Sequence, residues 1–220
     1  MKKLIIGLFA LATTTAFGQY RRGNSIVIQP QVGIFGGLSV ANQYVHVPYD
    51  GDYSDNALAG GIAGIQLALP VSYGWYIQPE VSYSNMGTQF YQSDDAYQGN
   101  VNLHMNYLNV PVLFKYSEPF TGLGVFFGPQ YSYLLSAHQN ATGSQKHEYE
   151  SEDVKDYYHN SDFSGVVGLE YYFPNNGMPG AKFGLSVRYQ FGFVNVNNGA
   201  IDYGTTIHNN AFFLTAGIRF

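Results

Sequence analysis

Apolar and polar residues alternate along most of the chain with a period of two residues, which is typical of β-strands. In the C-terminal segment 210–220, every second position from Phe212 to Phe220 is apolar, and Arg219 lies on the other face. Residues 75–84, 107–116 and 182–191 show the same alternation. After the N-terminus, no stretch approaches the roughly 18 consecutive apolar residues of a transmembrane helix. The pattern therefore predicts an all-β protein.

The connections between the predicted strands alternate in length. Short links rich in Pro, Gly and Asn lie at 70–74, 117–121 and 174–180, as tight turns require. Short periplasmic turns at one end and long extracellular loops at the other are typical of an eight-stranded, up-and-down antiparallel transmembrane β-barrel. The long polar links are 41–56, 88–100, 138–160 and 195–209. The predicted strands are Ser25–Val40, Ala57–Leu69, Trp75–Gly87, Val101–Tyr116, Gly122–Ala137, Ser161–Phe173, Ala181–Val194 and Asn210–Phe220.

Alternation does not say which face meets water, so a soluble barrel of the lipocalin type is the alternative. Only 11% of the residues are charged, against about 25% in ordinary soluble domains, and the polar rows are mainly Gly, Ser and Gln. Aromatic residues make up 17% of the chain and recur at the ends of the apolar rows, which favours two girdles at membrane interfaces. We expect Trp75, Tyr116, Phe173 and Phe183 near the short turns, and Tyr83, Tyr133, Phe163 and Phe193 near the long loops.

The first residues have the form of an export signal. Lys2 and Lys3 are followed by an apolar stretch at 4–12 and by the small-x-small sequence 16–18. The apolar stretch is shorter than the roughly 20 residues that span a bilayer, which disfavours a membrane anchor. We therefore predict a signal peptide at 1–18 and a barrel domain at 19–220. The chain has no Cys, which excludes disulfides and Cys-based metal sites. Its net charge of -5 and the lack of a basic patch argue against a nucleic-acid partner.

Several of these segments also match a known family. Residues 107–116 have the sequence YLNVPVLFKY, residues 128–131 have GPQY, and the chain continues through Gly165 to Glu170 and ends in Phe220. In these motifs the chain resembles the PorT-like outer-membrane β-barrel family, which shares its architecture with OmpA- and OmpX-type barrels. The resemblance implies location in the cell outer membrane, and a C-terminal strand ending in Phe220 that is recognised by the outer-membrane assembly machinery. A role in a secretion system is consistent with it.

A set of charged residues falls on the rows that should face the barrel lumen. Charges in a narrow lumen must be paired or hydrated, because isolated burial is costly. We expect three of these residues to form a network in the middle of the lumen and two to lie nearer the periplasmic mouth. This network would act as a structural plug, or alternatively as part of a gated pore or a proton path. The middle set is Glu80, Glu170 and Arg188, and the mouth set is Lys115 and Arg219.

Two further groups of residues contain side chains that can carry chemistry. His104 has Ser82, Ser84 and Ser132 as potential neighbours, but none of these serines is in a nucleophile elbow. The link 138–160 carries three His and several carboxylates, whose spacing matches no defined metal site. We therefore predict no catalytic, cofactor-binding or metal-binding residue. The residues of that link are His138, His147, His159, Glu148, Glu150, Glu152, Asp153 and Asp156, which fit a solvated acidic loop.

The function expected from the sequence is that of a non-enzymatic outer-membrane barrel. It would present its loops at the cell surface or serve an envelope or secretion assembly, since the loops are rich in Tyr, a residue favoured at interfaces. A small gated pore and a lipid-modifying enzyme remain alternatives. The expected partners are outer-membrane lipid, the assembly machinery, and surface or secretion proteins.

Overall fold

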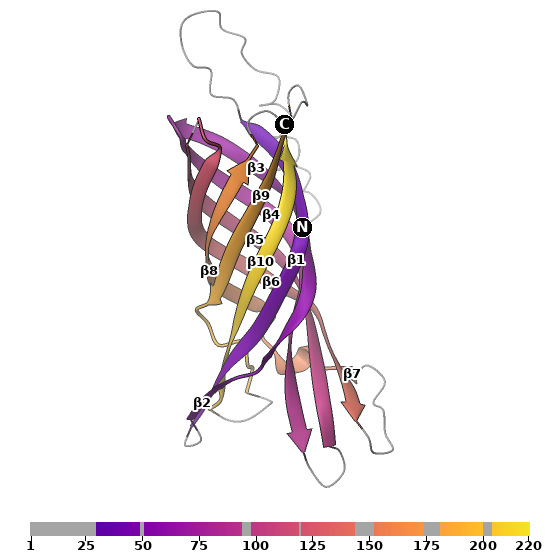
Figure 1. Cartoon of the computed structure of the whole chain (residues 1–220). Coiled ribbons are helices and arrows are strands. Elements are labelled where there is room, and N and C mark those ends of the chain that lie inside the picture. The colour runs from indigo at the N-terminus through magenta and orange to yellow at the C-terminus, as the bar shows by residue number, and fades with distance from the viewer. Residues whose placement is uncertain are drawn as a thin grey trace, which may run out of the picture.

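A computed structural model describes residues 30–48, 51–93, 98–118, 120–143, 152–173, 181–199 and 204–220. In these ranges one antiparallel sheet closes on itself, because the last strand pairs with the first (Figure 1). Eight long strands form the ring, and two short ones, β2 and β7, pair only with β1 and β6. This confirms the predicted eight-stranded antiparallel barrel. The elements are β1 (Gln31–Val47), β2 (Gly51–Ser54), β3 (Asn56–Ser72), β4 (Trp75–Ser93), β5 (Gln98–Ser117), β6 (Leu123–Gly143), β7 (Glu152–Asp153), η1 (Lys155–Tyr157), β8 (Ser161–Tyr172), β9 (Lys182–Gly192) and β10 (Thr206–Arg219).

The ring has a short-turn end and a long-loop end. At the short-turn end, Tyr73 and Gly74 alone connect β3 to β4, and the φ of 75° at Gly74 is one that residues with a Cβ rarely adopt. The C-terminus lies at this same end (Figure 1). In the described residues, no helix has both the length and the apolar character to cross a membrane.

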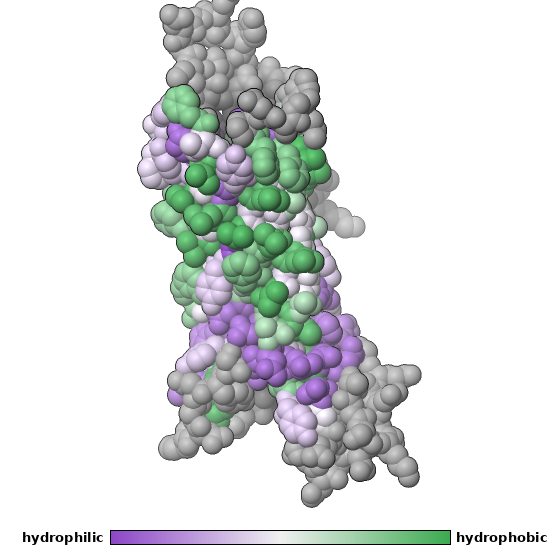
Figure 2. Space-filling model, in the orientation of Figure 1, coloured by the Kyte–Doolittle hydropathy of each residue, from purple (hydrophilic) through white to green (hydrophobic). Residues whose placement is uncertain are grey.

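The outer face of the ring is apolar near the short-turn end. Every second side chain of β5 from Leu108 to Phe114 points outward and is 38–46% exposed. Leu38 on β1 and Leu214 on β10, which pair in register, are 66% and 49% exposed. Figure 2 shows apolar side chains over the upper barrel on the side in view, with hydrophilic side chains below them. We call this surface the apolar band, and it confirms the predicted orientation with apolar residues outside and polar residues inside.

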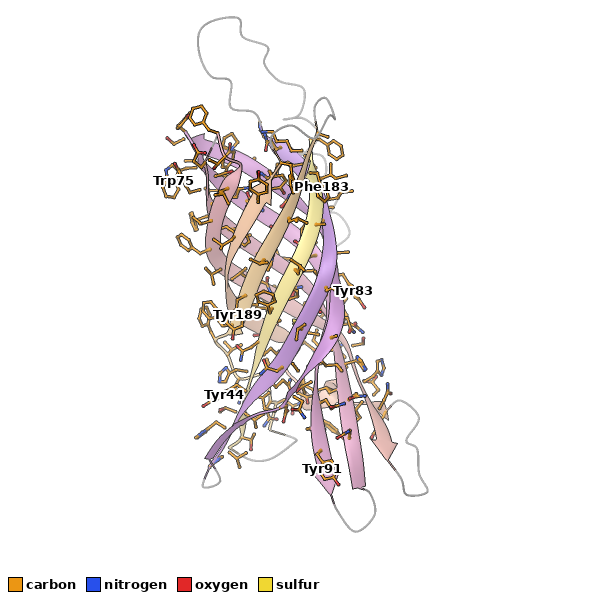
Figure 3. All side chains as sticks on the ribbon, in the orientation of Figure 1. Tyr44, Trp75, Tyr83, Tyr91, Phe183 and Tyr189 are labelled. Carbon is orange, nitrogen blue, oxygen red and sulfur yellow. The ribbon has the colours of Figure 1, made fainter. Side chains whose placement is uncertain are left out.

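Aromatic rings gather at both margins of the apolar band. At the short-turn margin the rings of Trp75 and Tyr116 are 5.1 Å apart, and those of Phe173 and Phe183 are 5.6 Å apart. At the other margin Tyr131 and Phe163 are in contact at 5.1 Å, as are Phe191 and Phe193. Figure 3 places Trp75 and Phe183 near the short turns, and Tyr83 and Tyr189 closer to the long-loop end.

Beyond the apolar band the alternation reverses. On β5, Leu103 and Met105 are buried inside the barrel, whereas Asn102, His104 and Asn106 occupy the outward row. The same exchange occurs on β1, where Val45 is buried and His46 is exposed, and on β10. Amide side chains link the outward row across strands, with Gln89 Nε2 donating to Asn102 Oδ1, and Asn85 Nδ2 to Asn106 Oδ1, both at 2.7 Å. The strands thus leave the apolar band and continue as a barrel with a polar exterior.

This reversal explains why five strands reach farther toward the long-loop end than predicted. The structure extends β1 to Val47, β4 to Ser93 and β6 to Gly143, and begins β5 at Gln98 and β10 at Thr206. These stretches are polar on the outward row, so the pattern assigns them to long loops, although their inward rows include buried apolar residues such as Ala41, Val45 and Ile207. Residues 25–29 of the first predicted strand lie outside the described residues.

Candidate functional site

The lumen near the short-turn end holds three of the predicted charged residues. Glu170 on β8 accepts two cations: its Oε1 lies 2.6 Å from Lys115 Nζ, and its Oε2 lies 3.4 Å from Arg219 Nη2. Gln78 Oε1 accepts hydrogen bonds from the same two groups, at 3.0 and 3.3 Å. The Arg219 guanidinium also lies 3.9 Å from the centre of the Tyr172 ring. All three charged side chains are at most 5% exposed.

The other two predicted residues form a pair deeper in the barrel. Arg188 Nη1 on β9 lies 2.7 Å from Glu80 Oε2 on β4, and the other oxygen of Glu80 accepts from Gln78 Nε2 at 2.7 Å. The guanidinium carbon of Arg188 lies 5.0 Å from the ring centre of Phe35 and 5.3 Å from that of Phe126. These rings exclude water from the pair, so each charge depends on its partner.

All five charged residues therefore lie in the lumen, but their grouping differs from the predicted one. Glu170 was expected beside Arg188, whereas it contacts Lys115 and Arg219. The register gives the reason, because Glu170 pairs with Ser186 and Arg188 pairs with Gly168, one inward position closer to the long-loop end. Gln78 connects the two groups, and no feature of the sequence pattern identified that role.

Between the Arg188–Glu80 pair and the long-loop end, the lumen is filled by neutral polar side chains. Gln130 Nε2 donates to Gln190 Oε1 at 2.9 Å and to Ser132 Oγ at 3.0 Å. Asn109 Nδ2 donates to Ser84 Oγ at 2.9 Å. These five residues are at most 6% exposed. They fit the small polar side chains expected in a barrel of eight strands, which is too narrow for an open channel.

The next level contains a carboxylate that the sequence analysis did not single out. Asp162 on β8 is fully buried, and its Oδ2 accepts from Asn209 Nδ2 at 3.0 Å. The same Asn209 nitrogen donates to Tyr107 Oη at 3.0 Å, and Asn209 Oδ1 accepts from Gln43 Nε2 at 3.0 Å. Asp162 lies eight positions before Glu170 on the same row of β8, so the period of two could have placed it in the lumen.

Apolar side chains from two connections close the long-loop end of the lumen. Val154, Tyr158 and Val196 are 2%, 9% and 0% exposed and belong to one cluster with Leu103 and Ile207. Burial raises the pKa of the Tyr158 phenol. We call residues 152–160 and 194–197 the outer cap.

Backbone hydrogen bonds attach the outer cap to the barrel wall. Val154 N donates to Ala137 O at 3.0 Å, and Val196 N donates to Ile207 O at 2.9 Å. His159 N donates to Val196 O at 2.8 Å, so the two connections are also bound to each other. Apolar packing together with these bonds closes the lumen opposite the charged groups.

The outer cap corrects the prediction that 138–160 is a solvated acidic loop. Residues 138–143 belong to β6, and 152–160 fold over the mouth. The side chains of Glu152, Asp153 and Asp156 are exposed, while His147, Glu148 and Glu150 lie outside the described residues. In the part of the chain that is described, no three His, Cys, Asp or Glu side chains are close enough to hold a metal ion.

The structure also separates His104 from the three serines that the sequence suggested as its neighbours. Ser82, Ser84 and Ser132 are at most 3% exposed and face the lumen. His104 shares the outward row of β5 with Leu108, four residues away, and pairs in register with His138. His104 therefore does not lie beside these serines, because the polar residues of β5 move to the outward row where the strand passes the apolar band.

One family model and several solved structures are similar to this chain. A family model described as an outer membrane protein β-barrel domain matches residues 17–198. Neisserial surface protein A (NspA) is 10% identical, with 86% of this chain and 95% of that chain covered and a TM-score of 0.46. Ail, the attachment invasion locus protein of Yersinia pestis, is 16% identical, with 88% and 100% covered and a TM-score of 0.43. OprG from Pseudomonas aeruginosa is 10% identical, with 86% and 95% covered and a TM-score of 0.40. No curated protein matches the sequence.

Proposed function

Because the chain belongs to the outer membrane protein β-barrel domain family and is located in the cell outer membrane, we propose that it is a non-enzymatic scaffold with a closed lumen. It holds a surface of strands and connections outside the membrane, where that surface binds a partner at the cell surface or in an envelope assembly. Outer-membrane lipid surrounds the apolar band.

The closure of the lumen carries this proposal. Ion pairs fill the short-turn half of the barrel, amide side chains fill the middle, and the outer cap covers the far mouth. A small gated pore would need both the outer cap and the Arg188–Glu80 pair to move. The proposal of a lipid-modifying enzyme is disfavoured because, in the described residues, His104 faces away from the buried serines.

The surface at the long-loop end supports partner binding. The β4–β5 hairpin and the β1–β2 hairpin project beyond the rest of the ring (Figure 1). Tyr44, Tyr91 and Tyr157 are 39%, 60% and 43% exposed there, and Figure 3 shows Tyr91 far along the β4–β5 hairpin. Tyr is enriched at protein interfaces because it combines an apolar ring with a hydroxyl group. The long links contain further tyrosines whose side chains lie outside the described set, namely Tyr49, Tyr53, Tyr97, Tyr149 and Tyr203.

A secretion role is the second candidate, favoured by the resemblance of residues 107–116 to the PorT-like family. Both candidates are tested by replacing Tyr91 and Tyr157 with Ser in the full chain and measuring surface attachment and secretion by intact cells. A loss of attachment with normal secretion supports loop presentation. A loss of secretion with normal attachment supports the secretion role. Tyr171→Ser, near the short-turn end, is the matched control.

If neither attachment nor secretion changes although the barrel is present in normal amount, the exposed tyrosines do not bind a partner and the proposal of loop presentation is wrong.

A further inference from the structure

Three buried polar atoms on the inward rows of β8 and β9 have no hydrogen-bond partner within the described residues. They are Asp162 Oδ1, Ser164 Oγ and Gln190 Nε2, and their side chains are at most 1% exposed. Asp162 and Ser164 are consecutive inward residues of β8, and Gln190 on β9 pairs with Val166, the next inward position. Buried polar atoms without a partner are rare, because their desolvation is not compensated. The arrangement points to a small bound species.

Among the described residues no Lys or Arg side chain pairs with Asp162, although His208 interacts with it electrostatically. Within the described residues, the buried ion pairs join Lys115 and Arg219 to Glu170, and Arg188 to Glu80, and none involves Asp162. The excess positive charge around Glu170 lies eight residues farther along β8, roughly 26 Å away at the usual rise of a strand. At that separation it cannot neutralise a buried carboxylate locally.

From this geometry we propose that Asp162, with Ser164 and Gln190, forms a site that takes up one small positive charge from solution, either a proton or an alkali-metal ion. Both species remove the same uncompensated charge. The oxygens of Asp162 and Ser164 suit either species. A water molecule that accepts a hydrogen bond from Gln190 would complete the set of contacts around it.

Occupancy of this site is coupled to the outer cap. Asn209 donates from one nitrogen to both Asp162 and Tyr107, and Tyr107 packs in the same apolar cluster as Val154 and Val196. An unneutralised carboxylate would draw water to the underside of that cluster. We therefore expect loss of the bound charge to loosen the outer cap and to destabilise the folded barrel.

The groups around the site limit other sources of charge. Tyr107 faces Asp162 from β5, and His208 lies beside Asn209 on β10 and interacts with Asp162 electrostatically. From β6 the facing residue is Ser132, and on β9 Arg188 lies deeper and is bound to Glu80. Of the described groups around the site, His208 is the one that could replace the proposed ligand, so it is included in the test.

The experiment is urea unfolding of the full chain in lipid vesicles, for the wild type, Asp162→Asn and the exposed control Asp156→Asn. One series raises pH without alkali ions, and the other exchanges choline for Na⁺ at fixed alkaline pH. If a proton is bound, the unfolded-to-folded ratio of the wild type rises by up to tenfold per pH unit while the folded barrel keeps the proton that the unfolded chain has lost. The ratio levels off once the folded barrel loses the proton too. If Na⁺ binds, the ratio falls by up to tenfold for each tenfold rise in Na⁺. Asp162→Asn should lose the dependence that Asp156→Asn keeps.

The proposal is wrong if wild type and Asp162→Asn depend equally on pH and on Na⁺, or if His208→Gln alone removes the dependence. If Asp162→Asn does not fold, the wild type still decides the matter by infrared spectroscopy and by its Na⁺ series. A wild-type barrel that shows neither the carbonyl band of a protonated carboxylic acid at neutral pH nor stabilisation by Na⁺ would overturn the proposal.

Discussion

Arg188 donates a hydrogen bond to Glu80 over 2.7 Å in the centre of the barrel, although the two residues lie 108 positions apart in the chain. The pair joins β9 to β4 across the lumen, between the rings of Phe35 and Phe126. It therefore ties opposite walls of the ring together at a level where water is excluded. The stability of the barrel should depend on both partners at once.

Removal of either partner should be more damaging than removal of both. Glu80→Ala or Arg188→Ala leaves an unpaired buried charge, which typically costs about 3–5 kcal/mol. The double substitution leaves no such charge, so its loss should be smaller than the sum of the single losses. Urea unfolding in lipid vesicles measures all three, with the exposed Lys182→Ala as control. Additive losses would show that the two side chains act independently.

The reversal of polarity along the strands sets where charge is tolerated on the outer face. Leu214→Arg, in the apolar band, should destabilise the barrel by about 2–4 kcal/mol, because lipid surrounds that position. His104→Arg, on the outward row beyond the band, should change stability by about 1 kcal/mol or less. The same unfolding assay compares them. Equal losses at the two positions would contradict the assignment of the band margin between Leu108 and His104.

The C-terminal residue should matter for assembly and not for the folded state. Phe220 is 62% exposed and follows β10, which closes the ring against β1. If the assembly machinery recognises this strand, Phe220→Ser should reduce the amount of folded barrel in cells several-fold while refolding of the purified chain into vesicles is unchanged. Heat-dependent gel migration measures both amounts. Equal loss in cells and in vesicles would instead assign Phe220 a structural role.

Much of the architecture followed from the period of two. The row from Leu108 to Phe114 and its neighbour Lys115 were placed on the correct faces, because lipid and lumen impose opposite preferences on alternate residues. The strand ends were misplaced, because outside the band water reverses those preferences and polar outward residues such as Asn42, His46 and Gln89 have the composition of a loop.

The contacts inside the lumen were less predictable. Alternation places Glu170 and Arg188 on the inward face but does not give the register that separates them, and this register assigns Glu170 to Lys115 and Arg219. The outer cap depends on Val154 and Val196, single apolar residues in polar connections, whose burial arises only from tertiary packing.

The most direct test of the closed scaffold is planar-bilayer conductance of the refolded wild-type barrel and of Val196→Asp, which places a charge in the outer cap. We expect no channel steps from the wild type and none from Arg188→Ala, because the outer cap still covers the mouth, whereas Val196→Asp should show intermittent openings. Sustained channel currents from the wild type would contradict the closed lumen and would favour the gated pore.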